Sequence, residues 1–465
     1  MPRENGLPDL AGGEPAGRVE ALIELTHDLL GLEDPEALKR VLDEQRPADL
    51  ADLLRRLDDE TREAVFKLLD TEPAAEALAE ADTPTIIAIA DDLGHQELSD
   101  LVEEMEPDDA ADVLGDLEEE DAEKILDLME DEEAQEVQEL MTHEEDTGGG
   151  IMTPRLVLAH ASSRVSDVVD TLRQEAEDAE IYCLFVVDEE DRLQGVVPLH
   201  LLVTARPDTV ITSLMDRDVI SVTTDMDQEE IAQLFVRYDL TVAPVVDEDQ
   251  RVVGQITVDD AMDVLVEEAT EDLYRMAGTS GDEAERDSVF GVAFTRLPWL
   301  LLCLLGSFLS GLVISFFDVT LEKAITLAAF IPVIMATGGN SGLQASTVTV
   351  RGLVMGNVAS GLLVRTVLRE TGTAVVIGLI CGLAASGVAW IWFGEALVGV
   401  CVGVAMFLVI CLAVLLGVLA PLFFNRVGID PAVASGPFIT TTNDILGLLI
   451  YLGLATLLIQ KLSGG

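Results

Sequence analysis

Basic residues are scarce in the first 290 positions of this 465-residue chain, which hold 20 Lys and Arg against 80 Asp and Glu. The formal net charge of −59 at pH 7 therefore comes from this part of the chain. A surface that acidic repels the phosphate backbone of nucleic acids and concentrates cations around itself. The composition thus argues against nucleic acid as a partner.

Cysteine and histidine are sparse as well, and neither forms a metal-binding or catalytic pattern. Four of the five Cys lie beyond residue 300, Cys183 stands alone, and no CxxC or zinc spacing occurs. A disulfide framework or a thiolate metal site is therefore not expected. All five His precede residue 201, so a membrane metalloprotease of the HExxH type has no ligands in the apolar half, and we expect no enzyme.

Charge nearly disappears after residue 290, where 7 basic and 6 acidic side chains remain. A bilayer core needs about 20 apolar residues per helix. Five runs are long enough, at residues 297–317, 324–350, 371–393, 396–424 and 431–460. Residues 291–465 are therefore expected to form an α-helical polytopic membrane domain of five spans in a lipid bilayer.

Basic residues orient these spans. The loops on the side of the acidic half hold Arg296, Arg351, Arg365, Arg369 and Arg426. The opposite loops hold only Lys323, with Lys461 at the far terminus. The positive-inside rule therefore predicts a cell-membrane protein with a cytoplasmic N-terminus, and the odd span count puts Gly465 outside.

Asp444 lies about fourteen residues into the fifth run, close to mid-bilayer. A carboxylate there is expensive unless it is paired or hydrated, and no basic residue lies in any run, so its simplest partner is a cation. It shares one helical face with Gly436, Thr440 and Gly447. Oxygen ligands of this kind suit Mg²⁺ or Ca²⁺. One Asp cannot strip Mg²⁺ of its waters, so we expect a hydrated ion between the two chains of a homodimer.

Two further membrane segments stand out. Residues 337–344 of the second run contain three glycines and several polar residues. Such a backbone is tolerated where it faces protein or a water-filled path, and close helix packing through small residues is the alternative. Asp430 precedes Pro431 and is interpreted mainly as the N-cap of the fifth span.

Residues 18–146 are typical of an acidic cytoplasmic α-solenoid. The segment 47–57 recurs sixty residues later as 107–117, and a weaker copy begins at Pro84. Repeated helix pairs of this kind stack on one another. Most of the acids are interpreted as a solvated surface. The Pro/Gly-rich residues 1–17 are expected to be disordered and not a signal peptide.

A second repeat follows, in which the pattern of residues 184–195 recurs 59 positions later at 243–254. This pattern resembles a tandem pair of CBS domains, α+β modules that often bind adenine nucleotides. We place them at residues 147–207 and 208–262. Thr257 and Asp260 of the second copy match the arrangement with which such modules hold ribose and phosphate. The resemblance therefore implies at most one ATP site per chain, or none.

Residues 259–276 form an amphipathic helix by periodicity and lead, within a connecting segment at 263–290, to the first span. Its polar face carries six acids: Asp260, Asp263, Glu267, Glu268, Glu271 and Asp272. Like charges at helical spacing destabilise a helix by ~0.2 to 0.5 kcal/mol per pair. The stripe therefore favours bound divalent cations, and an exposed acidic connector is the alternative.

The whole arrangement resembles the MgtE family of magnesium channels. The motifs that carry the resemblance are Gly-Gly-Asn-Ser-Gly-Leu-Gln at 338–344, Glu-Ala-Thr-Glu-Asp at 268–272, and Asp-Pro-Ala at 430 continuing to 447. The resemblance implies a homodimer whose second and fifth spans line the pore. Asp444 would hold hydrated Mg²⁺ there, with Asn340, Thr440 and Gly436 beside it.

The same resemblance implies that cytoplasmic carboxylates bind further Mg²⁺ and close the pore when cytosolic Mg²⁺ is plentiful. The implied sensor residues are Asp260, Asp263, Glu268, Glu271 and Asp272, with Asp109 and Asp112 in the solenoid. The expected function is Mg²⁺-gated import of Mg²⁺. Some members have Asn where this chain has Leu343 and Gly436, which leaves transport of Mn²⁺, Co²⁺ or Ca²⁺ open. A CBS-linked anion channel is disfavoured by a mid-membrane Asp without basic residues.

Overall fold

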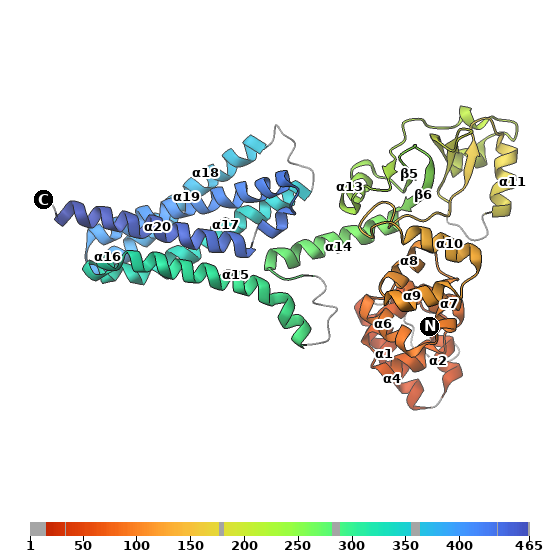
Figure 1. Cartoon of the computed structure of the whole chain (residues 1–465), viewed down its shortest axis with the longest axis horizontal. Helices are drawn as coiled ribbons and strands as arrows, with labels where there is room; N and C mark the ends of the chain where they lie inside the picture. The colour runs from red at the N-terminus through yellow and green to blue at the C-terminus, as the bar shows by residue number, and fades with distance from the viewer. Residues whose placement is uncertain are drawn as a thin grey trace, which may run out of the picture. The chain divides into compact units, whose positions relative to one another are not determined.

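The computed structural model describes residues 15–32, 34–175, 181–280, 289–354, 363–434 and 436–463 (Figure 1). The chain forms two compact units, Met1–Leu265 and Val266–Gly465. The expected disordered lead-in lies outside the described residues up to position 14. Residues 15–17, which we had included in it, instead begin the first helix.

Ten short helices in the described residues make up the first part of the first unit. They are α1 (Pro15–Gly31), α2 (Pro35–Leu42), α3 (Pro47–Arg56), α4 (Asp59–Phe66), α5 (Thr71–Ala79), α6 (Thr83–Asp92), α7 (His95–Val102), α8 (Pro107–Gly115), α9 (Glu119–Leu126) and α10 (Asp131–Leu140). From α2 onward each helix starts 12 residues after the previous one. The sixty-residue recurrence therefore spans five of these units. Odd-numbered helices from α1 to α9 pack each on the next, as a solenoid requires.

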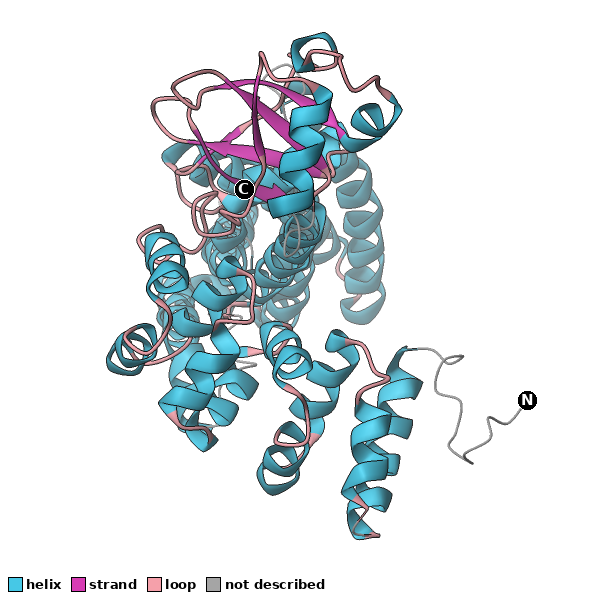
Figure 2. Cartoon of the chain, turned by 90° about the vertical axis from the view of Figure 1, so that its right-hand side faces the viewer, coloured by secondary structure: helices cyan, strands magenta, loops and turns pink. Residues whose placement is uncertain are grey.

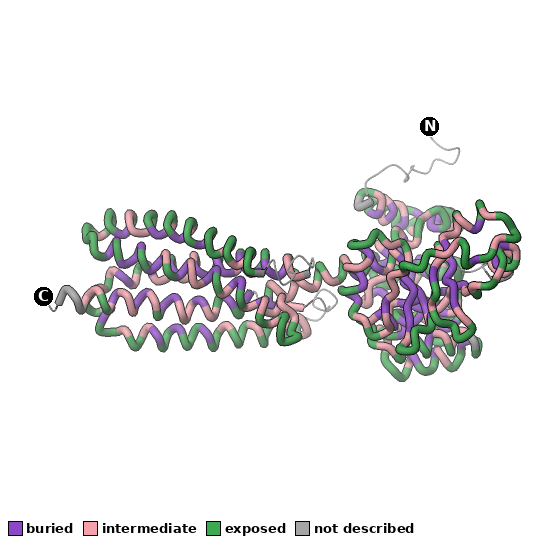
Figure 3. Tube along the Cα trace, turned by 90° about the horizontal axis from the view of Figure 1, so that it is seen from above, coloured by how far each residue is buried: buried purple, intermediate pink, exposed green. Residues whose placement is uncertain are grey.

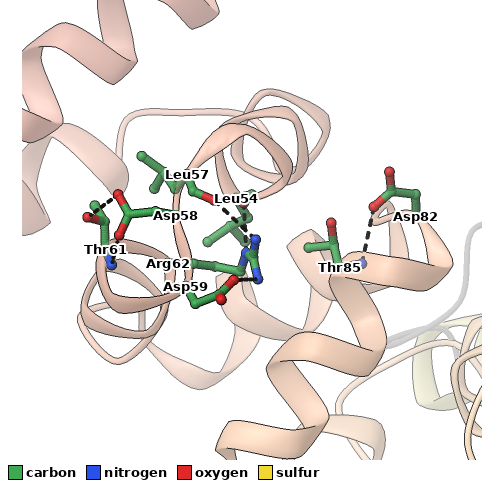
Figure 4. Close-up of polar contacts among 8 residues, drawn as sticks. All are labelled: Leu54, Leu57, Asp58, Asp59, Thr61, Arg62, Asp82 and Thr85. Atoms are coloured by element: carbon green, nitrogen blue, oxygen red, sulfur yellow. Dashed lines mark hydrogen bonds and ion pairs between the residues drawn. The ribbon is translucent and has the colours of Figure 1, made fainter. Parts of the chain in front are cut away.

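Some of the solenoid acids stabilise helix starts. The Asp58 carboxylate accepts the N–H of Thr61 (3.2 Å) and its hydroxyl (2.9 Å), and Asp82 accepts the N–H of Thr85 (3.3 Å), as Figure 4 shows. Arg62 donates to two backbone carbonyls of the preceding helix end, at 3.0 and 3.1 Å. Such caps contribute about 1 kcal/mol each. Part of the acidic composition thus serves the fold and not ion binding.

Two three-stranded sheets follow, and Figure 2 shows their strands gathered together. The first contains β1 (Leu158–His160), β2 (Cys183–Val187) and β3 (Leu193–Pro198), and the second contains β4 (Val222–Thr223), β5 (Val242–Val246) and β6 (Val252–Thr257). The accompanying helices are α11 (Val165–Glu175), α12 (Leu199–Thr204), η2 (Ile211–Ser213) and α13 (Gln228–Tyr238). In each sheet the first pair is parallel and the second antiparallel, with a register shift at the same point. The expected tandem repeat is confirmed.

The segment that opens each copy pairs with the sheet of the other copy. Thr153 donates its N–H to the carbonyl of Gln255 in the second sheet (2.9 Å), and Val196 of the first sheet donates to Asp216 (2.9 Å). Glycine is required where the segments cross, because a Cβ on Gly195 would lie 2.5 Å from the Asp216 carbonyl oxygen. The two copies therefore fold as one body.

Helix α14 (Val258–Ala277) agrees with the expected connecting helix. Its first turns belong to the first unit, where Ala261 and Val264 are buried. The division between the two units falls at residues 265 and 266, within this helix.

Among its described residues, the second unit contains five helices long and apolar enough to cross a membrane, as expected. Its elements are α15 (Val289–Phe316), α16 (Asp318–Lys323), η4 (Ile325–Phe330), α17 (Ile331–Val354), α18 (Leu363–Phe393), α19 (Ala396–Val427), η5 (Pro431–Ala434) and α20 (Gly436–Ser463). Helix α19 is the most buried of the five and contacts α17, α18 and α20. Figure 3 shows buried and exposed residues alternating along the long helices of this unit. Helix α15 is the most exposed of the five and packs on α20.

Two details differ from the sequence expectation. Pro431 starts the short 3₁₀ helix η5 and not the fifth span, which begins at Gly436. Asp430 accordingly caps η5, because its Oδ1 accepts the N–H of Ala432 at 2.7 Å. The glycine-rich segment lies within the continuous helix α17.

Candidate ion-binding sites

The glycines of α17 allow close packing within the membrane unit. A Cβ on Gly338 would lie 2.7 Å from Val409 Cγ1 and 2.8 Å from Asn443 Nδ2. A Cβ on Gly342 would lie 2.8 Å from Ile439 Cγ2. Of the two sequence interpretations, close helix packing is therefore correct for these two glycines.

The polar residues beside these glycines remain accessible. Asn340 on α17 and Thr440 on α20 are exposed, and Asp444 is half-buried. Helices α17 and α20 contact each other, and the Cβ position of Gly339 lies 3.6 Å from the Thr440 methyl group. Three of the four predicted pore residues therefore sit on two adjoining helices, with side chains that are at least partly accessible.

Two other residues of the predicted ion-binding face serve packing. Gly436 is buried, and a Cβ there would lie 2.1 Å from the carbonyl oxygen of Met276. Gly447 is buried against Val409. The Gly436 carbonyl accepts the hydroxyl of Thr440 at 3.1 Å. The accessible oxygens of this face therefore belong to Thr440 and Asp444, and the role of Gly436 as a ligand stays a prediction.

A first carboxylate cluster lies within the first unit, where the start of α14 meets the solenoid. Burial raises the pKa of Asp109 to about 7, and the charges of Glu106, Asp260, Glu80 and Asp259 add to this effect. Mutual electrostatic influence of this kind requires proximity. The structure therefore brings Asp109 of the solenoid close to Asp260 at the start of α14.

The pKa values of the α14 carboxylates in this cluster are also raised. Burial raises the pKa of Asp260, although the hydroxyl and N–H of Thr257 donate to it and act in the opposite direction. Burial, followed by the charge of Asp259, raises the pKa of Asp263. The pKa of Glu80, at the end of α5, is also raised, by burial and then by the charges of Asp263 and Asp259. Asp112 lies exposed on α8.

Asp108 is a member that sequence reasoning missed. It is only 9 % exposed, its Oδ1 has no hydrogen-bond partner among the described residues, and burial raises its pKa well above the usual value. The repeat contained a signal, because the matching position in the earlier copy is Ala48. A carboxylate at a position suited to alanine is unfavourable unless something neutralises it.

A second cluster lies within the second unit, around the last turns of α14. The Arg275 guanidinium contacts both Glu271 and Asp430. Burial, followed by the charges of Asp430 and Glu268, raises the pKa of Asp272 to about 6, while Arg275 lowers it. Apart from Asp112, the predicted sensor residues therefore form two groups, and Arg275 and Asp430 are participants that the carboxylate pattern did not reveal.

Neither cluster is a closed coordination shell. Within the described parts of the chain, no three Asp, Glu, His or Cys side chains converge into a group able to hold a metal ion. Mg²⁺ usually keeps several of its waters and prefers oxygen ligands. Neighbouring carboxylates without nitrogen or sulfur donors therefore fit a hydrated Mg²⁺ better than a dehydrated transition metal.

The predicted nucleotide motif is internally bonded. Thr257 donates its N–H (3.1 Å) and its hydroxyl (2.6 Å) to Asp260 Oδ2. The same hydroxyl contacts Asp259. Asp260 thus links the end of β6 to the start of α14 and also belongs to the first carboxylate cluster.

Comparison with known proteins agrees with this organisation. Residues 331–454 match the family model MgtE, described as a divalent cation transporter, and residues 45–146 match the MgtE intracellular N domain. Residues 149–208 and 211–267 match the CBS domain model.

Several known proteins resemble the chain over long stretches. The magnesium transporter MgtE of Bacillus subtilis (strain 168) is 35% identical over 425 residues, covering 91% of this chain and 94% of the relative. The protein of the same name from Thermus thermophilus is 39% identical over 319 residues, covering 68% of this chain and 71% of the relative.

Two solved structures resemble the acidic part. One is the cytosolic domain of the Mg²⁺ channel MgtE in complex with ATP, at 39% identity and a TM-score of 0.50, covering 52% of this chain and 99% of that one. The other is the soluble part of a magnesium transporter, at 29% identity and a TM-score of 0.50, covering 54% and 99%.

Proposed function

The chain belongs to the MgtE family of magnesium transporters, and on that premise we propose that it imports Mg²⁺ through a homodimeric pore that cytosolic Mg²⁺ closes. Mg²⁺ transport follows from the family. The direction, the dimer and the gate are the proposal. The observation that carries it is the placement of Asp444, a carboxylate on an accessible part of the apolar helix α20.

The pore proposal rests on the chemistry of that carboxylate. Within the described residues Asp444 makes no ion pair with a basic side chain, and Thr440 and Asn340 are the nearby accessible polar groups on α20 and α17. A charge in hydrocarbon needs a counter-charge or water. A hydrated Mg²⁺ supplies both, and a second copy of the same face supplies a second carboxylate. Asp444, Thr440, Asn340 and Gly436 are therefore our proposed pore residues.

The gate proposal rests on the two carboxylate clusters. In the first, burial raises the pKa of Asp109, Asp260 and Asp263, and neighbouring carboxylates add to each shift, so that ionising these groups is unfavourable when no cation is present. A divalent cation reverses this repulsion, and it favours whichever conformation brings the carboxylates together. Helix α14 carries members of both clusters. We therefore assign the sensor to Asp109, Asp112, Asp260 and Asp263 together with Glu268, Glu271 and Asp272.

Orientation and domain limits complete the proposal. The family matches place the N-terminal domains in the cytosol. Five spans then put the C-terminus outside, and the transport direction is inward. We propose domain limits of 18–146, 147–207, 208–262, 263–290 and 291–465, the fourth being a connecting segment that α14 enters.

ATP binding at the second CBS copy is a separate part of the proposal. A structural relative of this part of the chain was crystallised with ATP. Thr257 and Asp260 are adjacent here, and only Oδ2 of Asp260 accepts from Thr257. We propose that Asp260 also receives the ribose, so that nucleotide and divalent cation both act on the start of α14.

Flux measurements on the full chain in proteoliposomes test this function. Purified protein should transport Mg²⁺, with Ca²⁺, Mn²⁺, Co²⁺ and Cl⁻ offered separately at matched ionic strength. We expect Mg²⁺ flux that falls as Mg²⁺ on the cytoplasmic face rises. Equal flux of Ca²⁺, Mn²⁺ or Co²⁺ would favour the broader selectivity that Leu343 and Gly436 leave open, and Cl⁻ flux would contradict the proposal.

A further inference from the structure

The last turn of α14 packs directly against the first turn of α20, because glycines at the contact leave no side chain between the two backbones. A Cβ on Gly436 would lie 2.1 Å from the Met276 carbonyl oxygen, and one on Gly278 would lie 2.8 Å from Pro437 Cγ. Gly278 has φ +78° and donates its N–H to the Arg275 carbonyl (3.0 Å), which ends the helix. A side chain at either glycine forces the two helix ends apart.

A basic side chain holds the same junction. The Arg275 guanidinium binds Asp430 and Glu271, and the side chains of Arg275 and Asp430 are only 39% and 26% exposed. The second oxygen of Asp430 is held by the N–H of Ala432 (2.7 Å), which fixes the direction of the carboxylate. The planar fork of arginine suits two carboxylates at once, and lysine offers only a point charge.

We infer that Arg275 is a positioning residue of transport, a tethered cation that latches the end of α14 to the start of α20 without a metal ion. The inference rests on the proposed gate, because it assigns part of the closed state's stability to the protein's own charge. Gly436 is eight residues from Asp444, about 12 Å along α20. A latch at Gly436 therefore acts directly on the helix that carries the proposed ion site.

The latch predicts a specific effect on gating. Without the Arg275 charge, more Mg²⁺ is needed to close the pore. A partly buried ion pair worth about 1 kcal/mol corresponds to a shift of roughly fivefold. Maximal flux at low cytoplasmic Mg²⁺ does not fall, since the Arg275 guanidinium binds Glu271 and Asp430, and neither is a proposed pore residue. A shift in midpoint without loss of flux separates positioning from general damage.

The experiment is a double-mutant cycle in proteoliposomes containing the full chain. We compare Arg275→Gln, Asp430→Asn and the double variant, and we measure the cytoplasmic Mg²⁺ concentration that halves Mg²⁺ flux. Asp430→Asn keeps the Oδ1 that caps η5. Both single variants should shift this midpoint upward about fivefold, the double variant should shift it no further, and Arg275→Lys should restore part of the effect. Arg173→Gln, which removes an exposed ion pair with Asp170, is the matched control and should shift nothing.

Additive shifts in the double variant would overturn the inference, and so would a shift of Arg275→Gln equal to that of Arg173→Gln. A second comparison uses glycine. Gly278→Ala should raise the midpoint, whereas Gly394→Ala, at a similarly positive φ of +71°, should not, because nothing lies within 4 Å of that position in the described residues.

Hydrogen exchange in Mg²⁺-free buffer separates failure of the latch from failure of the gate. Amides of residues 271–277 should exchange faster in Arg275→Gln than in wild type. If wild-type flux proves insensitive to cytoplasmic Mg²⁺, the proposed gate is wrong, and the latch is then judged on exchange alone. Unchanged exchange in Arg275→Gln overturns the latch whatever the flux shows.

Discussion

The two units of this chain place carboxylates in opposite environments: clustered at the start of α14 in the first unit and single on the membrane helix α20 in the second. Near the start of α14, burial raises the pKa of Asp108 and Asp109, and the nearby charge of Asp260 adds to both shifts. In the membrane unit, Asp444 stands on an apolar helix with no basic partner in the described residues. The first situation is electrostatic crowding and the second is isolation. In the function we propose, a divalent cation relieves both, but it holds protein elements together in the first case and passes through in the second.

The largest effect that this comparison predicts is at Asp444. Asp444→Asn keeps the shape and hydrogen bonding of the side chain and removes its charge. Mg²⁺ flux in proteoliposomes should fall by about 100-fold or more, equivalent to about 2.7 kcal/mol. Folding should be unaffected, as judged by gel filtration and thermal unfolding. Flux at the wild-type rate in a well-folded variant would remove Asp444 from the ion path.

The next effect concerns the packing that supports the membrane face. Gly338→Ala places a methyl group 2.7 Å from Val409 Cγ1, and overpacking of this kind costs about 1 to 3 kcal/mol. The unfolding temperature in detergent should fall by roughly 2 to 10 °C. Gly453→Ala is the control, because a methyl group there meets nothing within 4 Å among the described residues. Equal behaviour of the two variants would mean that α17 does not need its glycine for packing.

A smaller effect tests the crowding in the first unit. The folded pKa of Asp109 is about 7, above the usual value near 4, so the folded state keeps a proton that the unfolded chain has already lost. The contribution of Asp109 to stability without Mg²⁺ should therefore fall as pH rises from 5 to about 7, by at most about 1.4 kcal/mol per pH unit. Thermal unfolding of the full chain, followed by circular dichroism, measures this.

Asp109→Asn should make the pH profile of stability less steep, with the remaining slope due to other carboxyls whose pKa burial raises. Glu119→Gln, at an exposed acid on α9, should leave the profile unchanged. Millimolar Mg²⁺ should also flatten the wild-type profile, because a bound cation replaces the proton. A profile that is equally steep in Asp109→Asn would show that the crowding does not involve this residue.

Sequence patterns predicted the elements with strong periodicity. The five spans, the tandem CBS repeat and the helix at 258–277 follow from local hydrophobic spacing and appear as expected. The family assignment followed from motifs distributed along the chain. Long-range contacts were not predictable in this way. The local sequence does not indicate that Arg275 contacts Asp430, 155 residues away. Nor does it indicate that the Met276 carbonyl packs against Gly436.

The site residues show the same limit. Spacing on a helical wheel put Gly436, Thr440 and Asp444 on one face of α20, yet packing covers Gly436 and leaves the other two accessible. The pattern of acids pointed to Asp109 but missed its neighbour Asp108, whose burial depends on how α8 packs. Spacing predicts which side chains share a face of an element, and only tertiary packing decides which of them stay open.

We propose that the first carboxylate cluster sets the Mg²⁺ concentration at which the pore closes, whereas Asp444 sets the conductance of the open pore. The direct test neutralises Glu80, Asp109 and Asp263 together, as Glu80→Gln, Asp109→Asn and Asp263→Asn. A control variant removes equal charge from exposed CBS turns, as Glu189→Gln, Glu190→Gln and Glu248→Gln. The measurement is the open probability and single-channel conductance of the full chain as cytoplasmic Mg²⁺ is raised from micromolar to ten-millimolar levels.

We expect the cluster variant to need at least about tenfold more Mg²⁺ for closure, equivalent to about 1.4 kcal/mol, with unchanged conductance. The control variant should close at the wild-type concentration. A cluster variant that also closes at the wild-type Mg²⁺ concentration, or a control variant that shifts as far, would contradict the assignment of the sensor to these carboxylates.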